Sequence, residues 1–160
     1  MNQALLVGAL WLHNLSTVIL IGYYLILALV FLPAFGKDTK GSNLGLMIEQ
    51  VSSRTRILII GSLVGLIVTG LYLMFMDPGY KSFADLSSTW GFLILVKHVL
   101  LVIMIGLGYF TDRAILPAVA KPVKGKLGTN PFLKQLKVIV NVLAILGVAI
   151  LLMTALAQAL

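Results

Sequence analysis

The chain has 160 residues, of which 60% are hydrophobic and only 11% are charged, with a formal net charge of +7. Soluble domains average about 45–50% apolar and about 25% charged residues, so this composition excludes an ordinary soluble protein and indicates an integral membrane protein. The chain contains no cysteine, which excludes disulfides, iron–sulfur clusters and covalently attached c-type haem.

Four apolar segments are long enough to cross a bilayer, for which a helix needs about 20 residues. They predict an all-α fold, an integral membrane four-helix up-down bundle, built as a single domain of residues 1–160. The half-polar segment 42–53, which precedes the second span, predicts a separate short interfacial helix. The spans are expected at about 4–33, 57–76, 91–111 and 136–157.

The basic residues are distributed unevenly among the predicted loops. Ten Lys and Arg residues lie between the first and second spans or around the connection of the third and fourth, whereas Lys81 is alone on the opposite side. Short loops rich in Lys and Arg stay in the cytoplasm. We therefore expect a multi-pass protein of the prokaryotic cytoplasmic (inner) membrane with both termini outside, and the charge requires no nucleic acid partner. At the inner end of the third span, Asp112 and Arg113 are expected to pair with each other.

The first and third spans share a spacing that predicts an internal repeat. His13 is followed by Tyr24 eleven residues later and then by a Leu-Pro pair, and His98 is followed by Tyr109 eleven residues later and then by another Leu-Pro pair. Eleven residues make about three helical turns, so each Tyr lies on the same face as its His. We expect a parallel two-helix repeat, with spans one and two matching spans three and four.

The two histidines of the chain lie inside predicted spans, where an ionisable side chain is costly and usually faces the bundle interior. His13 and His98 lie at nearly the same depth, and the first and third helices of an up-down bundle are diagonal neighbours. Two facing imidazoles suit a haem b whose iron is held by both rings. Gly91 would make room for the macrocycle, and Lys97 and Trp90 would lie near its propionates.

This site predicts membrane one-electron transfer, because two axial histidines saturate the iron. The protein would act alone or as a subunit of a larger respiratory or photosynthetic complex, with other membrane or periplasmic redox subunits as partners in the lipid bilayer. An oligomer is compatible with the sequence. No catalytic residues are expected, since the sequence has no nucleophile constellation, phosphate loop or nucleotide motif. The chain is therefore not expected to be an enzyme on its own.

Copper is the alternative metal for the same histidines. Met74 and Met76 lie at the outer end of the second span, and thioether sulfur suits Cu(I). Because they lie one to two turns beyond the histidines, they would form an entry path for copper. A third interpretation is a structural membrane subunit that binds no metal.

A further set of residues follows the motifs of a known family: Arg54, Thr69-Gly70-Leu71, Asp85-Leu86, Thr89-Trp90-Gly91, Lys97, Arg113 and Leu116-Pro117. The chain resembles the copper resistance protein D family of putative copper export proteins, which implies a four-helix membrane domain and copper transport. Trp90 stands where that family has Tyr, Asp112 stands where it has Asn, and His98 lies outside its pattern.

Overall fold

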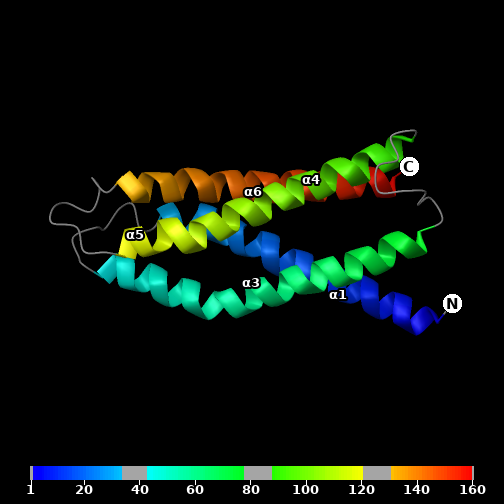
Figure 1. The fold of residues 1–160 in the computed structure, drawn as a ribbon, viewed down its shortest axis with the longest axis horizontal. Coiled ribbons are helices and arrows are strands. Elements are labelled where there is room, and N and C mark those ends of the chain that lie inside the picture. Colours follow the sequence, from blue (N-terminus) through cyan, green and yellow to red (C-terminus); the bar gives the residue numbers. More distant parts are fainter. Residues whose placement is uncertain (1, 34–42, 78–87, 121–130, 160) are drawn as a thin grey trace.

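The structure, a computed structural model, describes residues 2–33, 43–77, 88–120 and 131–159. Within these residues the chain is almost entirely helical and forms no strand, which confirms the predicted all-α fold (Figure 1). Its elements are α1 (Gln3–Ile26), the π-helical turn η1 (Leu27–Phe31), α3 (Asn43–Met76), α4 (Thr89–Phe110), the π-helical turn η2 (Thr111–Ile115), α5 (Leu116–Ala120) and α6 (Pro131–Gln158).

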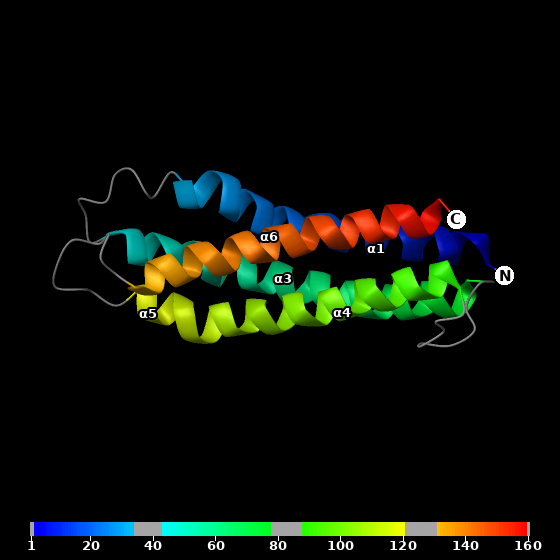
Figure 2. The ribbon, with the colours of Figure 1, turned by 90° about the horizontal axis from the view of Figure 1, so that it is seen from above.

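Two helix pairs build the bundle. α1 packs along α3, α4 packs along α6, and α1 also contacts α6. The long helices run up and down the long axis, and both described chain ends lie at one end of the bundle (Figures 1 and 2). We name this end the outer end and the opposite end the inner end, after the predicted orientation. The predicted four-helix up-down bundle is confirmed.

The outward faces of the helices are apolar. Trp11, Leu29 and Ile57 expose 65%, 71% and 79% of their surface, which suits contact with lipid rather than with water. All four long helical segments of the described chain have the length and composition needed to cross a membrane, so this is a multi-pass membrane protein of the lipid bilayer. They are Gln3–Phe31, Gln50–Met76, Thr89–Val119 and Phe132–Gln158.

The prediction of a separate interfacial helix at 42–53 is wrong. α3 continues without a break from Asn43 to Met76, and no proline interrupts it. The Ser53 and Thr55 hydroxyls donate to backbone carbonyls of the preceding turn, at 3.0 and 2.8 Å. Because these polar side chains find partners within the helix, polarity alone does not end it.

The two π-helical turns occupy matching places in the two halves of the chain. Each is followed directly by a Leu-Pro pair, Leu32-Pro33 after η1 and Leu116-Pro117 after η2. In both, the N–H of the leucine donates to the carbonyl five residues earlier. A proline lacks the N–H that an α-helix needs and crowds the carbonyl four residues back, and a wider turn relieves that crowding. The shared feature supports the predicted parallel repeat.

Small residues let α1 and α3 approach closely at one point. A Cβ placed on Gly65 would lie 2.5 Å from the Oγ of Ser16, so a larger residue would force the two helices apart or turn the hydroxyl away. Gly61, one turn away, has open space around it. This contact fixes the helix pair on which the first histidine lies.

Candidate functional site

His13 is held by a hydroxyl from the neighbouring helix. Its ring nitrogen Nδ1 lies 2.9 Å from Oγ1 of Thr69, which is buried in α3. The Thr69 hydroxyl also bonds to the backbone carbonyl of Gly65, at 2.5 Å. A carbonyl can only accept, so the Thr69 hydrogen is committed to Gly65 and its oxygen must accept from His13. The imidazole of His13 therefore carries its proton on Nδ1, and the lone pair of Nε2 is left for a ligand.

The ring of His13 also needs the small residue next to Thr69. A Cβ on Gly70 would lie 3.3 Å from Cε1 of His13, which is tighter than ordinary van der Waals contact. Thr69 and Gly70 thus orient the ring together, one by a hydrogen bond and one by leaving space. The hydroxyl of Thr17, one turn along α1, donates to the backbone carbonyl of His13 at 2.9 Å.

His98 is oriented within its own helix. Its Nδ1 lies 2.7 Å from the backbone carbonyl oxygen of Ile94, one turn earlier in α4. Since that oxygen can only accept, His98 also carries its proton on Nδ1 and has a free Nε2 lone pair. The two histidines therefore present the same nitrogen, although different kinds of acceptor hold them.

The histidines and Lys97 share one region of the bundle. Lys97 and His98 on α4 lie close enough to His13 on α1 to influence its electrostatic environment. All three side chains are half-buried. Their placement is compatible with the predicted site, and metal binding there stays a prediction.

Trp90 and Gly91 begin α4 near the outer end. The N–H of Gly91 donates to Oγ of Ser88 at 3.1 Å, which caps the helix N-terminus. Gly91 is buried and Trp90 is half-buried in this first turn. The structure gives these residues a part in starting the helix, and their predicted contacts with a haem stay a prediction.

The two methionines of the predicted copper path point in different directions. Met74 is only 7% exposed, whereas Met76 is 44% exposed. Met74 follows Gly70 by four residues, so it lies on the same face of α3 about 6 Å nearer the outer end. Met74 can therefore belong to one path with His13, whereas Met76 faces outward.

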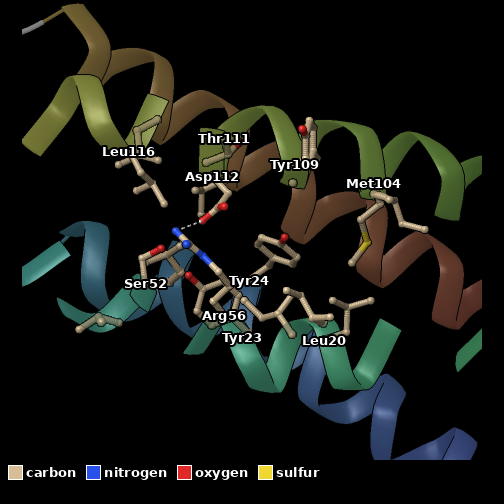
Figure 3. A pocket seen from close by; sticks show the side chains of 18 of the residues that line it. Leu20, Tyr23, Tyr24, Ser52, Arg56, Met104, Tyr109, Thr111, Asp112 and Leu116 are labelled. Carbon is tan, nitrogen blue, oxygen red and sulfur yellow. Dashed lines mark hydrogen bonds and ion pairs between the residues drawn. The ribbon is translucent and has the colours of Figure 1, made fainter. Parts of the chain in front are cut away.

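A cavity of about 250 Å³ lies nearer the inner end (Figure 3). Its walls come from all four long helical segments, and Tyr24 and Met104 are among the buried side chains that line it. Neither histidine lines it. The Tyr24 hydroxyl lies against Gly108, where an added Cβ would be 2.6 Å away. No sequence feature indicated this cavity, because its walls combine segments that are far apart in the chain.

An ion pair is part of the cavity lining. Arg56 on α3 donates to the Asp112 carboxylate in η2 at 3.0 Å, with side-chain exposures of 50% and 29% (Figure 3). The prediction that Asp112 pairs with Arg113 was wrong. Arg113 instead lies over the ring of Tyr109, 5.7 Å from its centre. Neighbouring residues point to different sides of a helix, so the carboxylate reaches α3 and the guanidinium does not.

The sequence was compared with models of known protein families, and one of them matches. The sequence model of the family described as copper resistance protein D matches residues 49–157. The matched range is more than half of the chain and includes Thr69, Met74 and His98, whereas His13 precedes it. No curated protein and no solved structure matches the chain.

Proposed function

This chain belongs to the copper resistance protein D family, and from that membership we propose that it binds Cu(I) within the membrane and carries it across. His13 and His98 would be the principal ligands, and Met74 would lie on the path from the outer end. Imidazole nitrogen and thioether sulfur are ligands that copper accepts, and the cysteine-free sequence offers no thiolate. The metal is the cargo in this proposal.

The shared tautomer of the two histidines carries the proposal. A metal-ligating imidazole usually donates its second N–H to a carbonyl, carboxylate or hydroxyl, which orients the ring and raises the basicity of the other nitrogen. His13 donates to Thr69 and His98 donates to the Ile94 carbonyl. Both rings thus offer a free Nε2 from opposite helix pairs of the bundle.

Lys97 explains how such a site would release its ion. Lys97 is next to His98 in the chain, and its positive charge would oppose a bound cation and so weaken the site. Transport requires binding that is favourable enough for entry and weak enough for exit. Lys97 would supply that weakening, whereas a storage site would gain nothing from it.

A Cu(I) titration of the purified protein in detergent tests the proposal. Under anaerobic, reducing conditions, competition with a chromogenic Cu(I) chelator should show one Cu(I) bound per chain. His13→Ala and His98→Ala should each weaken binding strongly, with the helix content unchanged by circular dichroism. Wild-type protein that takes no copper from the chelator, or affinities that are equal in all three proteins, would contradict the proposal.

Haem b is the second candidate ligand, with one-electron transfer as the function. The same two Nε2 lone pairs favour it, because haem iron also takes axial imidazole nitrogen. Family membership gives copper the stronger support, and neither histidine lines the described cavity. A low-spin, six-coordinate visible spectrum of reduced protein from haem-replete cells would favour haem. A colourless protein that binds Cu(I) would exclude it, and a protein that binds neither would be a metal-free subunit.

We also propose the prokaryotic cytoplasmic membrane as the location, with the outer end of the bundle facing outside. The excess of basic residues in the loops of the inner end supports this orientation. Cysteine placed at exposed Ala159, near the outer end, should react with a membrane-impermeant maleimide in intact cells. Cysteine at exposed Ser53, near the inner end, should react only after the cells are opened. The reverse pattern would invert the orientation.

A further inference from the structure

An apolar layer separates the histidine site from the inner cavity. Leu20, Leu66 and Leu143 are at most 8% exposed and belong to one packed cluster that also contains Met104. Leu20 follows His13 by seven residues and Met104 follows His98 by six, which places the layer about 10 Å nearer the inner end. An ion that left the histidines for the cavity would have to cross this layer.

Met104 is the member of the layer that can bind a soft metal ion. It is 2% exposed, lies on α4, and lines the cavity (Figure 3). The other buried residues of the cluster offer hydrocarbon, apart from the Tyr24 hydroxyl, whose hard oxygen suits Cu(I) poorly. The thioether of Met104 therefore lies between the two imidazoles and the cavity, at the depth where Cu(I) would otherwise have no ligand from the cluster.

We propose that Met104 is a transfer ligand that passes Cu(I) from the histidine site through the apolar layer into the inner cavity. This inference rests on the proposed copper transport. The ion keeps its charge and oxidation state, exchanges imidazole nitrogen for thioether sulfur, and then enters the cavity. A single thioether binds Cu(I) weakly, which is what a point of passage requires. From the cavity the ion would leave past the Arg56–Asp112 pair, the partly exposed part of its lining.

If Met104 serves only to pack the core, the expected transport rate of its leucine variant is different. Methionine fills irregular gaps in apolar cores, and replacing it by leucine conserves volume and costs less than about 1.5 kcal/mol. If Met104 only packs, Met104→Leu should transport copper as well as the wild type does. If its sulfur binds the ion in transit, the same variant should fold normally and transport slowly.

The test measures Cu(I) movement into liposomes that contain the full-length protein and enclose a Cu(I)-sensitive fluorescent chelator. We expect Met104→Leu to slow the initial rate about tenfold or more, which corresponds to about 1.4 kcal/mol in the barrier. Its Cu(I) affinity in the chelator competition should stay at the wild-type value, because the histidine ligands are intact. Met153→Leu is the matched control, since Met153 is half-buried on α6 and does not line the cavity.

A second variant without sulfur at position 104 tests whether a slow rate comes from misfolding caused by leucine alone. Met104→Ile should be as slow as Met104→Leu, and both should keep the wild-type helix content. Rates equal to the wild type in either well-folded variant would overturn the inference and leave the proposed transport standing. Wild-type protein that binds Cu(I) but moves none would overturn the proposed transport, and the inference with it.

Discussion

Replacing Thr69 by valine should weaken copper binding although Thr69 is not itself a ligand. Valine has nearly the shape of threonine but no hydroxyl, so the substitution removes the acceptor that lies 2.9 Å from Nδ1 of His13. The space left by Gly70 beside the ring is unchanged. What is lost is the contact that fixes both the orientation of the ring and the position of its proton.

The expected magnitude follows from the burial of this contact. Thr69 is 5% exposed, so the Nδ1–H of His13 gains no ready access to water when the hydroxyl is removed. A buried donor left without an acceptor costs about 1–3 kcal/mol of stability. Loss of the group that orients a metal-ligating histidine typically lowers metal affinity about 10–100-fold. We expect Cu(I) affinity to fall by a factor in that range, with stability lowered by no more than the buried-donor cost.

Thr17→Val is the matched control. Thr17 also donates its hydroxyl to a backbone carbonyl one turn earlier, but it accepts nothing from the His13 ring. Both substitutions remove the same chemical group from the same kind of intrahelical bond, so their difference isolates the contact with the imidazole. Chelator competition should show a large loss for Thr69→Val and little change for Thr17→Val. Equal Cu(I) affinities in the two variants would refute the role given to Thr69.

Three further outcomes are expected. Met74→Leu should slow copper uptake from the outer end more than Met76→Leu, because Met74 is buried and Met76 is 44% exposed; equal rates in uptake assays would leave both as packing residues. Gly147→Ala should lower stability by about 1–3 kcal/mol, since its Cβ would lie 2.9 Å from Ile21 Cγ2, whereas Gly106→Ala, in open space, should change the thermal unfolding temperature little. Excess Cu(I) at a hundred times Kd should stabilise the wild type by about 2.7 kcal/mol and so raise its unfolding temperature, and removal of either histidine should reduce that shift because the affinity falls.

The sequence was sufficient to predict the number and type of the elements. Length and continuous apolarity determine whether a segment can span a bilayer, and both can be read directly from the chain. The boundaries were less accurate, as α3 begins at Asn43 rather than near 57. The π-helical turns were not predicted, because one extra residue in a turn leaves little trace in an apolar pattern. The prolines at 33 and 117 were the local signal of both turns.

The candidate site could be predicted only in part. His13 and His98 stood out because ionisable residues are rare and costly at membrane depth. Thr69 was visible as part of a family motif, but one sequence contains no information that a hydroxyl 56 residues away holds the ring of His13. The repeat suggested similar places for Tyr24 and Tyr109, yet they are 7% and 65% exposed. Burial depends on which neighbour covers a face, and spacing along one helix does not supply that.

The difference between the two histidines determines how copper would act on the bundle. His98 is held by its own helix, so its ring moves with α4, whereas His13 is held by Thr69 and moves with the α1–α3 pair. The principal packing in the bundle lies within the α1–α3 and α4–α6 pairs. An ion shared by both Nε2 atoms would therefore join two units that otherwise contact each other less, and its departure toward Met104 would free them. For this reason the thermal shift at a given Cu(I) concentration should be largest with both histidines present, because either one alone binds the ion more weakly and within a single pair.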